Sequence, residues 1–292
     1  MIRYPISESE LIKLIDKIKP DWRTRAALET QRFIDAKDYL EGSDFWGEIK
    51  EVYIDLQYEK CAYCETKLQG KSLASKVHEV EHFRPKSSIK VWPNPKSKRW
   101  KLFKPSWVTG AASKTGYFRL TYHPLNYAIA CTRCNSTLKS NYFPIKGKRD
   151  LLSAHPVNMQ SESQLLLYPI SSVDIDAPED IISFDGVLAV PAHDSGSKYE
   201  RAVTNIEFFQ LNHQDLTTRR GKAILGLWTA LMLAKQPGQE EFANSMINML
   251  CSPENEFSAC LCAFRTLFSR NFVKAQQIQN LLAEALLKER AE

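Results

Sequence analysis

The order of hydrophobic and polar residues predicts helices at the start of the chain. Ser7 and Glu10 have the spacing of a capping box, and apolar residues then recur every three or four positions over residues 11–18. We therefore expect a helix that begins after Ser7. The same spacing predicts two further helices, over about residues 21–40 and 45–58.

The pattern is different between residues 61 and 145, where proline and aromatic residues are frequent. Short runs at 77–83 and 117–122 are typical of strands. Residues 86–116 predict a long irregular loop, and a loop of that length usually serves a function. A short helix is expected at 135–140.

Toward the C-terminus, a hairpin is expected to precede a helical region. Residues 181–190 contain Asp185-Gly186, which is a turn signal between two apolar runs. Helical spacing then predicts helices over 199–211 and 216–234, with further helices to the end of the chain. The expected regions are an N-terminal helical region (1–59), a central core (60–150) and a mainly helical C-terminal region (151–292).

Positive charge is concentrated in the central core. The chain has 292 residues and a net charge of only +5, yet residues 82–149 hold 15 Lys and Arg and no Asp or Glu. Trp92, Trp100 and Trp107 are interleaved with the cations. Cations neutralise phosphates, and aromatic side chains either stack on unpaired bases or pack a loop. The block favours a nucleic-acid partner over a merely solvated loop.

Apolar runs and cysteine usage bear on where the protein works. No run approaches the roughly 20 apolar residues of a membrane span, and the first residues lack the apolar stretch of a signal peptide. We expect a cytoplasmic protein that has reduced thiols and does not contact a membrane. Cys251, Cys260 and Cys262 lie in an apolar helical stretch and are expected to be buried core thiols.

The other four cysteines form two Cys-x-x-Cys pairs, Cys61/Cys64 and Cys131/Cys134. Four thiolates close a tetrahedral structural Zn²⁺ site and leave no open position for chemistry. The alternative is a redox motif, but such motifs begin a helix after a strand of a thioredoxin-like fold, and the sequence does not have that context. The pairs therefore predict a structural zinc site.

The residues between and directly after the two cysteine pairs form a pattern that is similar to a known family. Glu81-His82, then Asn126, then Cys131-x-x-Cys134 followed by Asn135 resembles the HNH endonucleases. Asn at the last position makes this a His-Asn-Asn variant. The resemblance implies an α+β fold in which a ββα-metal nuclease core with a structural zinc is embedded between N-terminal and C-terminal helical regions.

The resemblance also implies roles for individual residues. His82, Asn126 and Asn135 would be the catalytic set, with His82 as general base and Asn126 orienting it. Glu81 and Asn135 would bind a catalytic Mg²⁺ or Mn²⁺. Because neighbours on a strand point to opposite faces, Glu81 and His82 can share a site only if the strand twists or ends there, or if the metal lies at its edge.

Three cations are candidates for contact with DNA. Arg84, Lys86 and Lys139 flank the motif and are expected to clamp backbone phosphates. The resemblance makes DNA the expected substrate, nicked or cut with little sequence preference. The alternative is a zinc-stabilised nucleic-acid-binding module without catalysis, in which Glu81 and His82 are incidental.

Short runs outside the motif suggest a narrower group. Glu81 to Lys86, Phe143-Pro144 and residues 209–212 (Phe-Gln-Leu-Asn) are similar to the HNH nuclease of bacterial anti-phage systems of Septu type. Zorya-type systems also carry an HNH nuclease and are the alternative. This resemblance implies a role in antiviral defence and a partner from the same operon, an ATPase or another sensor protein.

Overall fold

The computed structural model describes residues 1–292 except 43, 69–79, 172 and 290–292. The α-helices are α1 (Glu8–Ile18), α2 (Trp22–Ala36), α3 (Lys50–Leu56), α5 (Pro178–Ile181), α6 (Gly196–Phe208), α7 (Gln214–Leu233), α8 (Glu240–Cys251), α9 (Ser258–Arg270) and α10 (Phe272–Glu289). The strands are β1 (Val80–His82), β2 (Tyr127–Ile129), β3 (Ile182–Asp185) and β4 (Leu188–Pro191). Shorter 3₁₀ turns cover Phe45–Ile49, Lys98–Trp100, Phe118–Leu120, Pro124–Asn126 and Pro156–Glu162, and Arg133–Lys139 is a π-helix. The fold is α+β.

The first helix begins as the sequence predicts. The Ser7 hydroxyl accepts a hydrogen bond from the Glu10 amide at 3.2 Å, and the Ser7 amide donates to the Glu10 carboxylate at 3.0 Å. This confirms the capping box, which satisfies amides that the first turn leaves without partners. The second helix ends at Ala36, earlier than expected, because Lys37 adopts a left-handed conformation with φ 56°. Such a residue ends an α-helix.

Two short strands form the sheet of the central region. β1 and β2 pair antiparallel, with Glu81 opposite Ala128 and His82 opposite Tyr127. The first three residues of the expected strand 77–83 lie outside the described part of the chain. After β2, the π-helix Arg133–Lys139 covers most of the expected helix at 135–140.

The expected strand at 117–122 is wrong. The amide of Leu120 donates to the carbonyl of Tyr117 at 2.9 Å, so the segment coils into a 3₁₀ turn instead of extending. Its aromatic residues are buried on consecutive positions rather than on alternate ones, as Tyr117 and Phe118 show. Burial on all sides removes the alternation that would favour a half-buried strand.

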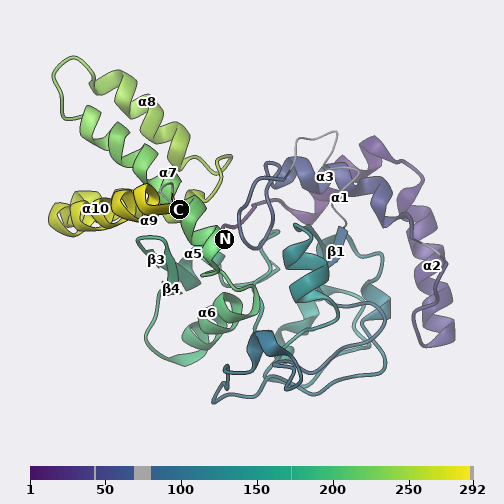
Figure 1. Ribbon diagram of the computed structural model, residues 1–292. Helices are drawn as coiled ribbons and strands as arrows, with labels where there is room; N and C mark the ends of the chain where they lie inside the picture. The colour runs from purple at the N-terminus through teal and green to yellow at the C-terminus, as the bar shows by residue number, and fades with distance from the viewer. Residues whose placement is uncertain (43, 69–79, 172, 290–292) are drawn as a thin grey trace.

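The C-terminal region carries a hairpin and a group of helices. β3 and β4 pair antiparallel, which confirms the predicted hairpin. Asp185 pairs with Leu188, so the turn consists of Gly186, with φ +58°, and Val187, one residue later than the predicted Asp185-Gly186. α9 packs on β3, and α7 packs against α8, α9 and α10. In Figure 1, α6–α10 lie on one side of the central segment and α1–α3 lie on the other.

The long loop at 86–116 contributes tryptophans to the protein core. Trp92 and Trp100 are almost fully buried, and their rings lie 5.1 and 5.8 Å from the ring of Phe208 in α6. Of the two roles open to these tryptophans, the structure therefore favours packing of the loop over stacking on bases. The loop is fixed to the C-terminal region by this aromatic cluster.

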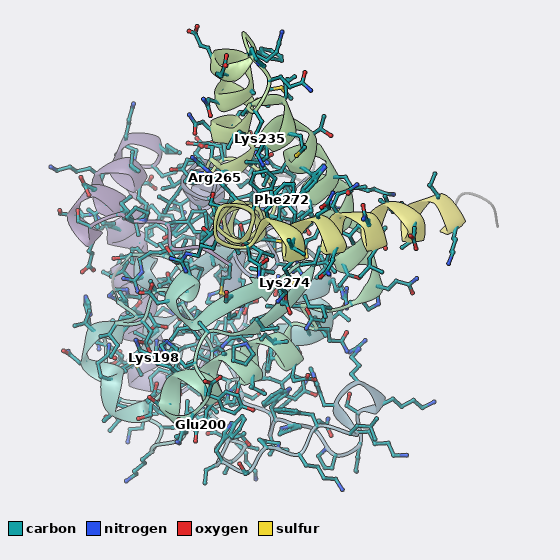
Figure 2. All side chains as sticks on the ribbon, turned by 90° about the vertical axis from the view of Figure 1, so that its left-hand side faces the viewer. Lys198, Glu200, Lys235, Arg265, Phe272 and Lys274 are labelled. Carbon is teal, nitrogen blue, oxygen red and sulfur yellow. The ribbon has the colours of Figure 1, made fainter. Side chains whose placement is uncertain are left out.

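Buried hydrophobic side chains form one continuous core that runs from Met1 to Ala275. α10 extends from this body, and Figure 2 shows Lys235 and Phe272 together where α10 begins, with the Lys235 ammonium 4.0 Å from the Phe272 ring. No helix in the described part of the chain is both long and apolar enough to span a membrane.

Candidate functional site

The four cysteines of the two Cys-x-x-Cys pairs meet at one point. Their sulfur atoms all lie within 4.8 Å of one another, and the sulfurs of Cys64 and Cys131 are 3.8 Å apart. Four sulfurs arranged tetrahedrally around Zn²⁺ at about 2.3 Å are separated by about 3.8 Å. The geometry and the donor set therefore fit a structural zinc ion.

This cluster fixes the elements around it. The amide of Ala62 donates to the carbonyl of Ile129 at 3.0 Å, which joins the first cysteine pair to β2. Gln57 donates to the same carbonyl and accepts from the Ile129 amide, each at 2.8 Å. Cys134 belongs to the π-helix and directly precedes Asn135. The cysteine cluster thus sets the position of Asn135 relative to the sheet.

One ring nitrogen of His82 forms a hydrogen bond within the protein. Its Nε2 lies 3.1 Å from the carbonyl oxygen of Thr121. A carbonyl oxygen only accepts, so Nε2 carries the proton and Nδ1 has a free lone pair. The rings of Trp46 and Tyr127 meet the imidazole nearly at right angles, at 4.9 and 5.1 Å. Together these contacts fix the tautomer and the orientation of His82.

The surroundings of His82 keep the ring neutral. Loss of solvation, with the ammonium groups of Lys86 and Lys139, lowers the pKa of His82 to about 3. A bound phosphate would oppose the effect of the two lysines and raise this pKa toward neutrality.

Glu81 is buried beside Lys139. The Lys139 ammonium lies 3.2 Å from Glu81 Oε1, and both side chains are almost completely buried. Burial lowers the pKa of Lys139, and the charge of Glu81 opposes this shift. The ion pair therefore holds the Glu81 carboxylate beside Lys139.

One cleft brings the predicted residues together. Its volume is about 460 Å³, and Glu81, His82 and Asn135 all line it. Val80, Glu81 and His82 of β1 all line the cleft, and no residue of β2 does. Glu81 and His82 reach the same space although they are neighbours, and β1 ends at His82, as one of the predicted arrangements requires.

Asn126 lies behind the cleft and does not line it. Its side-chain oxygen accepts from the Arg84 amide at 2.8 Å, and its amide group donates to the carbonyls of Arg84 and Leu120, both at 3.1 Å. It is fully buried and fully hydrogen-bonded. These contacts tie the turn after His82 to the loop that supplies Thr121, which suits the orienting role that the resemblance implies.

The three predicted phosphate clamps differ in their surroundings. Arg84 is 2% exposed and donates to Glu162 and Gln164, at 3.0 and 2.6 Å. Lys139 is fully buried against Glu81. Since a phosphate clamp must be accessible, these placements favour structural roles for Arg84 and Lys139. Lys86 is half-buried and lines the cleft, so it alone of the three is placed for substrate contact.

The basic loop adjoins the cleft. The Arg99 guanidinium donates to the carbonyl of Thr137 at 2.9 Å, and the Lys90 ammonium lies 3.4 Å from the hydroxyl of Ser140. Ser140 also lines the cleft. Several other cations of the loop are exposed, namely Lys96, Lys98, Lys101 and Lys104. Positive charge therefore continues outward from the cleft over the solvent-facing loop.

The N-terminal region supplies a wall of the cleft that the sequence did not predict. Asp44, Trp46, Gly47 and Lys50 line it. The Lys86 ammonium also lies 3.7 Å from the centre of the Trp46 ring. No local pattern indicates this wall, because it depends on a contact between segments far apart in the chain.

The run at 209–212 also has a structural place. The Phe209 ring stacks on that of Tyr63, between the first two cysteines, at 4.1 Å. The side-chain oxygen of Gln210 accepts a hydrogen bond at 2.9 Å from Arg133, the residue directly before Cys134. The C-terminal region thus packs directly against the cysteine cluster.

A second cluster of possible metal ligands is satisfied without a metal. Glu8, His123 and His155 lie close together, and His155 Nε2 is 3.0 Å from the Glu8 carboxylate. Nδ1 of each histidine accepts a backbone amide, from Leu125 and Val157. Each neutral ring must then keep its proton on Nε2, which leaves no lone pair there for a metal.

Comparison with known proteins gives one partial match. The chain is 29% identical to Septu protein PtuB of Bacillus mycoides (strain KBAB4) over 163 residues, which cover 56% of this chain and 46% of that protein. The match thus spans about half the length of each. No family model matches the chain, and no solved structure matches it.

Proposed function

We propose that this protein is a metal-dependent endonuclease that hydrolyses DNA phosphodiester bonds, by nicking or cutting, with low sequence specificity. The observation that carries the proposal is the single cleft lined by Glu81, His82 and Asn135 beside the four-cysteine cluster. These residues come from two elements, β1 and the π-helix, which the cysteine cluster holds together. Three of the four motif residues outside the cysteine pairs line this cleft, and the fourth, Asn126, does not.

In this proposal His82 is the general base. Its Nδ1 accepts a proton from water as the water oxygen bonds to phosphorus and the bond to the leaving 3′ oxygen breaks. The Thr121 carbonyl, which accepts from Nε2, stabilises the positive charge that the ring gains. Trp46 and Tyr127 keep Nδ1 directed at the substrate.

Glu81 and Asn135 are the proposed ligands of the catalytic ion. A carboxylate and a side-chain amide oxygen on one cleft are ligands that Mg²⁺ and Mn²⁺ prefer, so the donor set fits. Such an ion, when bound, stabilises negative charge on the phosphate and the leaving oxygen. Lys139 keeps the Glu81 carboxylate in place.

The proposed path of DNA runs from Lys86 in the cleft over the basic loop. Phosphate contacts from exposed cations give affinity without reading bases, which accounts for the proposed low specificity. Arg84 and Lys139 are not part of this surface, because both are buried.

The match to a Septu protein supports a role in anti-phage defence. The sequence runs named above point to the same group, and the proposal assigns the protein to the nuclease component of such a system. A nuclease with little specificity endangers its own cell, so we propose control by an ATPase or another sensor protein from the same operon. In Figure 1 the C-terminal helices α7–α10 lie apart from β1, whose residues line the cleft, and they are a candidate surface for such a partner.

The test is a supercoiled-plasmid assay with Mg²⁺ or Mn²⁺, in which zinc content is first shown to be equal. Wild type should convert the plasmid to open-circular and then linear DNA, and His82→Ala should not. The alternative, a binding module, predicts that neither protein cleaves and that both shift DNA on a gel. Assays with the operon neighbours then decide the alternative, because a nuclease that needs its partner cleaves in their presence and a binding module does not.

A further inference from the structure

Two cysteines outside the zinc cluster lie against each other between α8 and α9. Cys251 is the last residue of α8, and Cys262 lies in α9. The Cys262 thiol donates a hydrogen bond to the Cys251 carbonyl oxygen, with the sulfur 3.3 Å from that oxygen. The prediction of three buried core thiols is wrong for this pair, since Cys262 is exposed and Cys251 is half-buried.

The pair lines a cavity that is separate from the proposed nuclease cleft. Its volume is about 400 Å³, and α9 and β3 form much of its wall, with Ser258, Thr266 and Phe184 among the residues that line it. None of the four zinc-type cysteines lines this cavity. A small solute can therefore reach both thiols without opening the fold.

The two thiols differ in acidity. The hydrogen bond from Cys251, helped by Arg265, lowers the pKa of Cys262 to about 7, although burial opposes this shift. The same hydrogen bond and burial raise the pKa of Cys251. Cys262 is therefore the reactive thiolate, and Cys251 is a thiol in position to attack it once it is oxidised.

Cys260, which also lies in α9, differs from Cys262 in burial and acidity. It is fully buried and its thiol donates to the Gly186 carbonyl at 3.4 Å. Burial raises its pKa to about 12. It has neither the access nor the acidity that oxidation requires.

We propose that Cys251 and Cys262 are a redox-modification site, which forms a reversible disulfide on exposure to a peroxide. The Cys262 thiolate attacks a peroxide oxygen of H₂O₂, the O–O bond breaks, and the released hydroxide takes a proton to leave as water. Cys262 is then a sulfenic acid. The Cys251 sulfur attacks it, the S–S bond forms, the S–O bond breaks, and the second hydroxide takes the thiol proton. Two thiols are oxidised and one peroxide is reduced to two waters.

The disulfide would close segment 252–261, which touches the zinc region. The hydroxyl of Ser258 and the amide of Ala259 donate to the Glu65 carboxylate, at 2.9 and 3.3 Å. Glu65 directly follows the cysteine-cluster residue Cys64. The covalent link would therefore fasten α8 to the part of α9 that supports the cysteine cluster. This inference does not depend on the proposed nuclease activity.

The test is peptide mapping of the zinc-loaded full chain after brief treatment with H₂O₂ and rapid alkylation. Trypsin leaves Cys251, Cys260 and Cys262 in one peptide, because no Lys or Arg lies between Lys235 and Arg265. A second digestion after Glu254 and Glu256 separates Cys251 from the other two. Linked fragments that join Cys251 to Cys262, and that a thiol reductant separates, are the expected result.

Variants make the assignment specific. Cys262→Ser should abolish the link, Cys251→Ser should leave a Cys262 sulfenic acid that a dimedone probe labels, and Cys260→Ser should form the link as wild type does. A link through Cys260 would overturn the proposal. So would irreversible oxidation of Cys262 in wild type without a link, or three thiols that stay reduced while the zinc-type cysteines oxidise.

Discussion

His82 shows how far a single residue can be interpreted from sequence. The Glu81-His82 pair and its spacing to Asn126 and Asn135 marked it as a candidate base, and the structure places it on the cleft. The partners that define its tautomer could not be predicted. The Thr121 carbonyl and the Trp46 ring reach it only through tertiary contacts, which leave no local pattern.

Asn126 gives a prediction about stability at this scale. Asn126→Ala removes three hydrogen bonds and leaves the amide of Arg84 and the carbonyls of Arg84 and Leu120 unsatisfied in a buried place. We expect the free energy of unfolding to fall by about 2–4 kcal/mol. Urea denaturation at fixed zinc measures this. A loss below about 0.5 kcal/mol would show that Asn126 does not hold this turn.

His123 gives a prediction about pH. Burial, with the nearby His155, lowers the pKa of His123 from 6.5 to about 3, even though the Glu8 carboxylate is 3.7 Å away. A second ring proton would also displace the Leu125 amide from Nδ1. His123 therefore binds a proton below pH 6.5 in the unfolded chain, but only below about pH 3 in the folded chain. The resulting stability is complete above pH 6.5 and is lost as the pH falls toward 3.

The expected loss from this residue is about 2 kcal/mol between pH 6.5 and pH 5, at about 1.4 kcal/mol per unit. His123→Asn is the matched variant, because asparagine can still cap the turn and does not titrate. Urea denaturation at pH 7 and pH 5 should show a smaller drop for His123→Asn than for wild type. Equal drops would mean that His123 does not titrate in this way.

At the scale of elements, strong local signals predicted the secondary structure correctly, whereas runs of aromatic residues did not. The capping box at Ser7 and the hairpin at 182–191 both depend on local backbone geometry, and both are confirmed, although the hairpin turns at Gly186 and Val187, one residue later than predicted. The segment 117–122 has the composition of a strand, but burial on every side lets it coil. The tryptophans of the basic loop pack against Phe208 in α6, a partner that no local pattern indicates.

The stack of Phe209 on Tyr63 gives a prediction for this scale. Phe209→Ala removes a buried ring from the support of the cysteine cluster, so we expect a loss of about 3–5 kcal/mol in stability. It should also speed zinc loss to a chelator several-fold, because Tyr63 lies between Cys61 and Cys64. The control is Phe264→Ala, a truncation of a buried ring in α9 that contacts Trp228 of α7 rather than Tyr63. Equal rates of zinc loss from both variants would show that the Phe209–Tyr63 stack does not support the cysteine cluster.

At the scale of the whole molecule, the sequence predicted an α+β protein with a four-cysteine site, and the structure has both. It did not predict that the N-terminal region would form a wall of the cleft. It also could not distinguish the buried cations Arg84 and Lys139 from the accessible Lys86. Charge is visible in a sequence, but burial depends on how distant segments pack.

The measurement that tests the central claim most directly is the single-turnover rate of cleavage of a labelled DNA duplex in Mg²⁺ or Mn²⁺, with the operon partners present. Wild type, His82→Ala and the control His193→Ala are compared at equal zinc content; His193 is an exposed histidine that does not line the cleft. The account predicts that wild type and His193→Ala cleave alike, and that His82→Ala is slower by a factor of about 10² to 10⁴. Equal rates for His82→Ala and wild type, or no cleavage by any of them, would contradict it.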